Sequence, residues 1–428
     1  MNKKNFPLTK TQLEEVAGRY PTPFYLYDEA AIRRNAQAIL KAFSVFPAFR
    51  EHFAVKALPN PVILKILAAE GFGADCASYP ELLLAAMAGI RGEAMMFTSN
   101  ETPAREYQKA LELGAIINLD DLTHIDFLEK AARIPELISC RYNPGPLKGG
   151  NAIIGKPEEA KYGFTREQII GAFALLRDKG ARRFALHTMV ASNELNPEYH
   201  IETARILFEL AVEIQVKTGI RLEFVNLGGG VGIPYRPDQQ PIVYDYLAQG
   251  IKKVYDELIL PAGLDPLGIH TEWGRVITGP YGWLVTRAIH TKHIYRDYIG
   301  LDACMADLMR PGLYGAYHHI TIPGKEDAPL TETYDVVGSL CENNDKFAVQ
   351  RPLPKIQVGE TGGDFVIIHD AGAHGRAMGF NYNGKLRCGE LLLRPDGSLT
   401  MIRRPETVED YFATLDLKAL EGLGSGEE

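Results

Sequence analysis

The feature that most constrains this chain is an alternation of short apolar runs with amphipathic segments between residues 30 and 280. Between the runs, apolar residues recur at i, i+3 and i+4, the spacing of a helix with one buried face. Eight strand–helix alternations in about 250 residues predict a (β/α)8 TIM-like barrel domain at 30–280, although a doubly wound open sheet has the same alternation. The predicted strands are 51–57, 71–77, 94–99, 115–120, 137–143, 182–191, 222–228 and 267–273.

A second, β-rich unit is expected after the barrel. Short apolar segments separated by Gly, Pro, Asp and Asn turn signals predict a C-terminal antiparallel β domain, a sandwich or Greek key, at 281–418. The N-terminal segment 22–28, TPFYLYD, also has the pattern of a strand, so residues 1–29 are assigned to the same domain. The tail at 419–428 is rich in Gly, Ser and Glu, a composition typical of disorder.

Composition excludes several classes of protein. The 428 residues carry 46 Lys and Arg against 54 Asp and Glu, a net charge of −8 with no long basic run, which argues against a nucleic-acid partner. No apolar stretch is long enough to span a membrane, and no signal core follows the N-terminal lysines. The five cysteines are scattered and never in Cys-x-x-Cys spacing, so neither a disulfide framework nor a zinc ribbon is expected. We therefore expect a cytoplasmic protein.

Two residues at the ends of predicted strands have side chains suited to catalysis. Barrel enzymes place functional groups where strands end and the following loops begin. Lys56 ends the first strand in FAVKALPNP, either as a surface lysine or as a desolvated amine suited to forming a Schiff base. Asp75 ends the second strand in GADCAS, where a helix N-cap or turn residue is the alternative interpretation.

A glycine run follows the seventh predicted strand in NLGGGVGIPY, residues 226–235. Consecutive glycines, here including Gly229 and Gly230, allow backbone amides to approach a phosphate closely. The dinucleotide-binding fingerprint requires a further glycine where Ile233 stands, so dinucleotide binding is disfavoured. The run by itself is a weak indication of a phosphate site.

The eighth predicted strand ends in HTEWGR, which brings Glu272, Gly274 and Arg275 close together. An acid and an arginine at this spacing can form an ordinary structural ion pair. Beside a phosphate site and a reactive lysine, the acid can instead hold a cofactor ring nitrogen protonated. Both interpretations are open at this point.

The β region holds further reactive residue types. Arg310, in DACMADLMRP, can bind a carboxylate through two parallel hydrogen bonds. Cys341 and Glu342 offer an acidic thiol next to a carboxylate, although a small buried apolar residue is the commoner role of a free cysteine. His369 and His374 lack the neighbouring Cys or carboxylate pattern of a metal site, so no metal is predicted.

Several of these stretches together resemble one family. They are FAVKALPNP, GFGADCAS, RYNPG, NLGGGVGIPY, Glu-x-Gly-Arg, DACMADLMRP with YGAYH, VVGSLCENNDKFA, and AGAH with MGFNYNGKLR. Between residue 24 and about 395 the chain closely resembles the pyridoxal-phosphate (PLP) amino-acid decarboxylases with an alanine-racemase-like barrel, above all the diaminopimelate decarboxylase family. The Cys-Glu segment and the Asp-x-x-Met-x-Asp-Leu-x-Arg-Pro segment are the specific parts of this resemblance.

The resemblance implies a PLP site at the end of the barrel. Lys56 would hold PLP covalently until the substrate amine replaces it. Glu272 would pair with the pyridine nitrogen and keep it protonated, so that the ring accepts electrons when CO2 leaves. The other residues implied to bind or surround the cofactor are Asp75, Arg141, His187, Met189, Ser192, Gly229, Gly230, Gly274, Arg275 and His374.

The resemblance also implies a head-to-tail homodimer with shared active sites. Cys341 of the partner subunit would donate the proton that replaces CO2, and Glu342 of the partner subunit would bind the distal ammonium of the substrate. Arg275, Arg310 and Tyr314 match positions that bind the distal carboxylate of meso-2,6-diaminopimelate. A substrate that ends in an amine alone would leave a buried arginine unpaired.

The implied reaction is therefore decarboxylation of meso-diaminopimelate to L-lysine and CO2. A PLP decarboxylase of a different basic amino acid or carboxylated diamine, and a non-catalytic regulatory homologue, are the alternatives.

Three segments depart from the family pattern. The strand end His-x-His-Ile-Gly-Ser is here His187-Thr-Met-Val-Ala-Ser192, so Met189 stands where a histidine usually stacks on the PLP ring. A thioether can pack against an aromatic face but does not hydrogen-bond as histidine does. The usual Gly-Ala-Tyr at the phosphate ends in His374 here, and Leu58 replaces a common asparagine. We expect function to be retained, with altered contacts to the ring.

Overall fold

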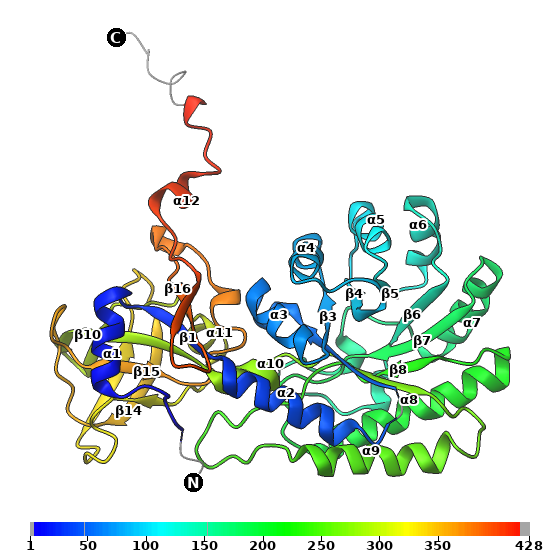
Figure 1. Ribbon diagram of the computed structural model, residues 1–428, viewed down its shortest axis with the longest axis horizontal. Helices are drawn as coiled ribbons and strands as arrows, with labels where there is room; N and C mark the ends of the chain where they lie inside the picture. Colours follow the sequence, from blue (N-terminus) through cyan, green and yellow to red (C-terminus); the bar gives the residue numbers. More distant parts are fainter. Residues whose placement is uncertain (1–3, 47, 152, 420–428) are drawn as a thin grey trace.

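The computed structural model describes residues 4–46, 48–151 and 153–419, and its first large unit is a closed barrel (Figure 1). The eight strands are parallel and follow each other around the barrel in chain order, and the first pairs with the last. Closure confirms the predicted (β/α)8 barrel and excludes the open sheet. The strands are β2 (Phe49–Ala54), β3 (Gly73–Cys76), β4 (Met95–Thr98), β5 (Ile116–Leu119), β6 (Leu137–Tyr142), β7 (Arg183–Thr188), β8 (Phe224–Asn226) and β9 (Gly268–Thr271).

Helices surround the barrel. They are α2 (Glu29–Phe43), α3 (Pro61–Ala69), α4 (Tyr79–Met87), α5 (Ala104–Glu112), α6 (Thr123–Ala131), α7 (Arg166–Asp178), α8 (Pro197–Thr218), α9 (Tyr244–Leu258) and the short α10 (Arg275–Thr278). Local sequence signals set several of their ends. The Asn60 side chain accepts from Val62 N–H at the start of α3, and Gly219 ends α8 in the left-handed conformation at φ 71°.

The second unit is a mixed β-sheet with mostly antiparallel pairs. Its elements are α1 (Lys10–Arg19), β1 (Phe24–Asp28), β10 (Gly282–His293), β11 (Asp297–Leu301), α11 (Arg310–Tyr314), β12 (Ile320–Thr321), β13 (Glu332–Val337), β14 (Lys346–Leu353), β15 (Phe365–Ile368), β16 (Gly389–Leu393), β17 (Leu399–Arg403) and α12 (Val408–Phe412). Two pairs are parallel, β1 with β16 and β11 with β13, which the antiparallel prediction did not include.

The N-terminal strand β1 lies inside this sheet, between β10 and β16, as predicted. Its side chains alternate between two apolar cores, because successive residues of a strand point to opposite faces. Tyr25 and Tyr27 belong to the large core, whereas Phe24 and Leu26 pack in a smaller core that α1 helps to form. The segment before the barrel therefore contributes side chains to the apolar core on each face of the sheet.

The chain passes from one unit to the other at two places, before α2 and after α10 (Figure 1). The predicted domain limits, 30–280 for the barrel and 1–29 with 281–418 for the β domain, stay predictions. Of the tail predicted to be disordered at 419–428, residues 420–428 lie outside the described residues. Within the described ranges, no helix has the length and apolar character needed to cross a membrane.

Candidate active site

A cavity of about 540 Å³ lies where the carboxyl ends of the barrel strands face the β-sheet unit. The barrel contributes the loops after β2, β6, β7, β8 and β9, and the other unit contributes α11 with the segment after it and the loop after β15. Of the residues singled out from the sequence, those that line it are Lys56, Met189, Ser192, Gly229, Gly230, Glu272, Gly274, Arg275, Arg310, Tyr314 and His374. Asp75, Arg141, His187, Cys341 and Glu342 do not line it.

Lys56 stands on a single 3-10 turn that follows β2, and its side chain is 53% exposed toward the cavity. Its Nζ lies 3.9 Å from Asp75 Oδ2. Asp75 is buried within β3, and Ser78 caps the next helix, so the alternative N-cap interpretation of Asp75 is wrong. Burial, and then the charge of Glu272, raise the pKa of Asp75 well above its usual range. The geometry leaves the lysine amine available to a carbonyl group in the cavity.

Glu272 directly follows β9 and is held by two side chains from neighbouring strands. His187 Nε2 lies 2.9 Å from Glu272 Oε2, and Asn226 Nδ2 donates to Oε1 at 2.7 Å. Burial would raise the pKa of Glu272, but His187 and then Lys56 lower it to about 2. Because the carboxylate carries no proton at neutral pH, His187 donates through Nε2–H. An ionised carboxylate held in this way can keep a ring nitrogen protonated.

A buried acid supports the segment that carries Glu272. The Glu51 carboxyl group accepts hydrogen bonds from the Thr271 hydroxyl and, at 2.6 Å, from Trp273 N–H. These two residues flank Glu272, so Glu51 fixes the backbone on both sides of it. Neither Glu51 nor Asn226 was singled out from the sequence. A glutamate inside a strand whose other residues are largely buried was the available signal for Glu51.

The glycine loop after β8 has no room for side chains. A Cβ atom on Gly229 would lie 2.6 Å from the Glu272 carbonyl oxygen, and one on Gly230, at φ 105°, would lie 2.6 Å from the Ala191 carbonyl oxygen. Gly229 N–H points to Met189 Sδ at 3.2 Å. Because these residues have no side chains, their backbone is open to the cavity, which suits the binding of a phosphate group.

Two arginines complete a cationic wall of the cavity. Arg275 Nη1 and Arg310 Nη1 both donate to Tyr235 Oη, at 2.6 and 2.8 Å, and Arg275 Nη2 lies 3.5 Å from Ser192 Oγ. In the described part of the chain neither arginine has a carboxylate partner, so the predicted alternative of a Glu272–Arg275 ion pair is wrong. Burial, and then the charge of Arg275, lower the pKa of Arg310. Two buried guanidinium groups without acids favour anionic ligands.

His374 lies beside these arginines in the left-handed backbone region, at φ 53°, and its N–H donates to the Ala57 carbonyl group at 2.8 Å. Burial, and then Arg275, lower its pKa well below the usual value, so its imidazole is neutral. Arg141 lies behind the cavity, 3.7 Å over the Tyr162 ring and 3.6 Å from Asp120.

Cys341 and Glu342 lie outside the cavity of their own chain. Cys341 is exposed, so its alternative interpretation as a buried apolar residue is wrong. Its N–H donates to Asn383 Oδ1 at 2.8 Å.

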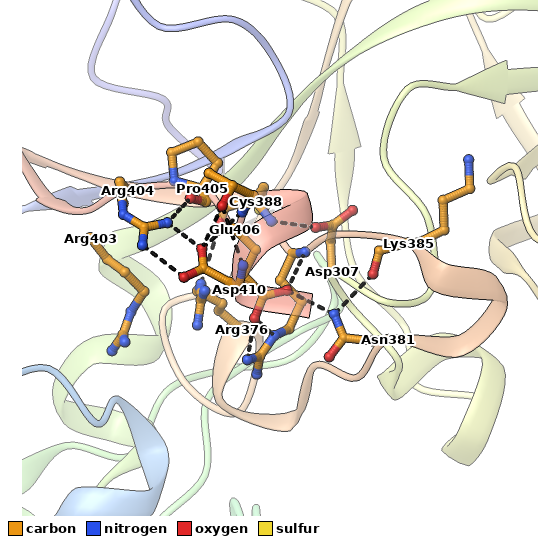
Figure 2. Close-up of polar contacts among 12 residues, drawn as sticks. Asp307, Arg376, Asn381, Lys385, Cys388, Arg403, Arg404, Pro405, Glu406 and Asp410 are labelled. Atoms are coloured by element: carbon orange, nitrogen blue, oxygen red, sulfur yellow. Dashed lines mark hydrogen bonds and ion pairs between the residues drawn. The ribbon is translucent and has the colours of Figure 1, made fainter. Parts of the chain in front are cut away.

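The loop that carries Asn383 is anchored to the C-terminal segment by a hydrogen bond from Asn381 Nδ2 to Glu406 (Figure 2). Arg387 also donates a hydrogen bond to Glu406. The backbone beside the thiol is therefore fixed from the C-terminal segment, while the thiol remains accessible.

Comparisons with known proteins identify the family of this chain. The family model described as "Pyridoxal-dependent decarboxylase, pyridoxal binding domain" matches residues 29–279. Protein TabA of Pseudomonas amygdali pv. tabaci is 43% identical over 416 residues, 97% of this chain and 95% of that protein. Diaminopimelate decarboxylase of Methanothermobacter thermautotrophicus is 33% identical over 403 residues, 93% of this chain and 92% of that protein.

The fold has close relatives among solved structures. Diaminopimelate decarboxylase from M. jannaschii in co-complex with L-lysine superposes with a TM-score of 0.88 at 27% identity, covering 98% of this chain and 100% of that one. Diaminopimelate decarboxylase from Helicobacter pylori complexed with L-lysine gives 0.83 at 29% identity, covering 96% and 100%. With a family match over more than half of its length, this chain belongs to the pyridoxal-dependent decarboxylases, as a PLP-dependent carboxy-lyase related to diaminopimelate decarboxylase.

Proposed function

We propose that this chain decarboxylates meso-2,6-diaminopimelate to L-lysine and CO2, the last step of lysine biosynthesis. The observation that carries the proposal is Arg310, which is buried at the cavity wall with no carboxylate partner among the described residues. A substrate with a distal carboxylate neutralises this arginine, whereas a simple diamine precursor leaves it unpaired at a cost of several kcal/mol. Relatives named diaminopimelate decarboxylase support the same substrate.

Residues of the barrel would hold PLP, which when bound supplies the electron-accepting ring. Lys56 would hold its carbonyl carbon, and the ionised Glu272 would keep its ring nitrogen protonated. Asp75 would keep the lysine amine in place, and His187 would hold Glu272. Met189 and His374 would lie against the cofactor. The residues proposed to surround its phosphate are Ser192, Gly229, Gly230, Gly274 and Arg275, with Arg141 behind the site.

The substrate would be oriented by both of its ends. Arg310, with Arg275 and Tyr314, would bind the distal carboxylate through charge-assisted hydrogen bonds. Glu342 of the partner subunit would bind the distal ammonium, and Cys341 of the partner subunit would donate the proton that replaces CO2. The exposed position of Cys341, outside the cavity of its own chain, supports a homodimer with shared sites. The scattered free cysteines support a cytoplasmic location.

A second candidate keeps the cofactor and changes the substrate to another basic amino acid or a carboxylated diamine. Two observations favour it. The 43% identical relative carries a different name, TabA, and Met189 and His374 replace a histidine and a tyrosine at the cofactor.

The direct test is release of CO2 and L-lysine from meso-diaminopimelate by the PLP-loaded protein, with L-lysine, L-ornithine and L-arginine as parallel substrates. Turnover of diaminopimelate alone is the expected result. Turnover of another of the four without diaminopimelate would retain the decarboxylase chemistry and reject the substrate. No release from any of them would contradict the first candidate and would exclude L-lysine, L-ornithine and L-arginine as substrates of the second.

A further inference from the structure

Arg310 is held by two acceptors at one nitrogen. Its Nη1 donates to Tyr235 Oη at 2.8 Å and lies 2.9 Å from His318 Nε2. Nη1 has two hydrogens, so both are used. Among the described residues, Nε and Nη2 of Arg310 make no side-chain hydrogen bond. The nitrogens that remain form the pair of parallel donors that a carboxylate accepts most strongly.

The contacts of His318 define which of its nitrogens carries the proton. Its Nδ1 lies 2.8 Å from the His369 carbonyl oxygen, which can only accept. Nδ1 therefore carries the hydrogen and Nε2 presents a lone pair to Arg310. Burial, and then the charge of Arg310, lower the pKa of His318 to about 3, so the ring stays neutral at physiological pH.

His369, whose carbonyl group orients His318, is itself held by hydrogen bonds. Trp283 Nε1–H donates to His369 Nδ1 at 3.2 Å, so His369 donates through Nε2–H to Thr321 Oγ1 at 2.7 Å. Thr321 belongs to β12, which pairs with β15 immediately before His369. The carbonyl group that orients His318 is thus held by the sheet on one side and by a buried tryptophan on the other.

We propose that His318 is a positioning residue that aims Arg310 at the distal carboxylate of the substrate and so determines the selection of substrates that carry one. The proposal rests on the proposed function, because it takes Arg310 as the carboxylate-binding residue. Loss of the Nε2 acceptor frees one Nη1 hydrogen and lets the guanidinium group turn about Tyr235 Oη. The carboxylate then meets donors that are no longer held parallel to it.

Two substitutions separate the two hydrogen bonds of His318. His318→Gln places an amide oxygen near the position of Nε2 and keeps an acceptor for Arg310. His318→Asn places an amide N–H near the position of Nδ1 and keeps the bond to His369 while it removes the acceptor. His319→Asn is the matched control, because His319 contacts Tyr317 Oη at 3.3 Å and no contact with Arg310 is found among the described residues.

Steady-state kinetics on PLP-loaded protein with meso-diaminopimelate is the measurement. We expect His318→Asn to raise KM about 10- to 100-fold, the value of one hydrogen bond to a charged group, with kcat changed less than about three-fold. His318→Gln and His319→Asn are expected to stay within about three-fold of the wild type in both constants. Equal KM values for the Asn and Gln variants would overturn the proposal, since a purely structural role makes no distinction between them.

A binding measurement keeps this test independent of turnover. Pimelate has both carboxylates of diaminopimelate and neither amine, and its affinity for the PLP-loaded protein is measured by calorimetry. If the wild type releases no CO2 from diaminopimelate, but His318→Asn weakens pimelate binding and His318→Gln does not, the proposed function fails and the role of His318 stands. No pimelate binding by an inactive wild type would overturn both. If His318→Asn loses the PLP absorbance, His318→Leu, which also lacks the acceptor, replaces it.

Discussion

Two groups proposed to take part in the reaction differ in their exposure to solvent. Glu272 is proposed to keep the cofactor ring nitrogen protonated, and Cys341 to donate the proton that replaces CO2. Glu272 is buried and held through both carboxylate oxygens, at 2.9 and 2.7 Å. Cys341 is exposed, outside the cavity of its own chain, and its backbone N–H donates to Asn383 Oδ1. The contrast supports a division in which one chain builds the cofactor site and a second copy supplies the proton donor. The predictions below test that division.

The largest loss of turnover is expected when Lys56, the residue proposed to hold the cofactor, is replaced. Lys56→Ala removes the amine that would hold the cofactor and return protons, and we expect turnover to fall at least about a thousand-fold. CO2 release, and mass spectrometry after borohydride reduction, measure the loss of activity and of the lysine adduct. Lys65→Ala, an exposed lysine of α3, is the control and should keep both. A retained adduct in Lys56→Ala would assign the cofactor to another lysine.

A smaller loss of turnover is expected when the proposed proton donor, Cys341, is replaced. Cys341→Ala leaves every cavity-lining residue in place, so PLP absorbance should be unchanged while turnover falls about 100-fold, the contribution of a general acid. Cys304→Ala, a change to a buried cysteine, is the matched control for thiol loss. Wild-type turnover in Cys341→Ala would remove Cys341 as the proton donor.

Mixing the two inactive variants tests the sharing of sites. If the partner's Cys341 completes each site, a heterodimer of the Lys56→Ala and Cys341→Ala chains has one intact site and one doubly altered site. Random exchange of subunits then restores about a quarter of wild-type turnover, because half of the dimers have one working site of two. Turnover that remains at the level of the separate variants would mean that each chain uses its own cysteine.

The free energy of unfolding at acid pH tests a different buried group, His52, which lies inside the barrel. Burial lowers the pKa of His52 to about 4, and its Nε2 lies 3.2 Å from His270 Nδ1. Between pH 6.5 and 4 the unfolded chain binds more protons at His52 than the folded chain does. His52 therefore stabilises the fold above pH 6.5, and by pH 5 about 2 kcal/mol of this is lost. Denaturant unfolding at pH 7 and 5 measures the fall, which should be smaller in His52→Gln; an equal fall would contradict the assignment.

The smallest effect is expected at Met189. Its thioether accepts from Gly229 N–H at 3.2 Å and lines the cavity where a histidine is usual. Met189→His restores the usual residue, and we expect kcat to change less than about ten-fold, with a shift of the PLP absorbance band, since a thioether can also pack against an aromatic ring face. Met87→His, an exposed methionine, controls for the substitution itself. A larger rise in kcat would identify Met189 as a true impairment.

Much of the barrel and its site follows from local sequence. The run predicted at 115–120 contains β5, and Lys56 and Glu272 lie directly beyond β2 and β9, as their positions at the ends of apolar runs indicate. In a closed parallel barrel all strands end at one face, so residues at those ends meet even though they are far apart in the chain.

Other elements could not be recognised in this way. The sequence pattern does not define β11 and β14, because both mix exposed and buried residues without a clear period and depend on the strands beside them. His187 and Glu272 were assigned to the cofactor by resemblance, but the bond that joins them, and the support from Glu51, appear only when β2, β7 and β9 lie together.

The sequence by itself determined the strand–helix alternation, the strand ends that carry the chemistry and the residue types available there, because these depend on apolar spacing and turn signals within a few residues. Closure of the alternation into a barrel depends on the pairing of β2 with β9, which the structure decided. Only the tertiary structure decided that Arg275 and Arg310 share Tyr235, that His318 presents a lone pair to Arg310, and that Cys341 lies outside its own cavity. Those relations join segments of different elements, and they exist only once packing has removed the water that would otherwise satisfy each group.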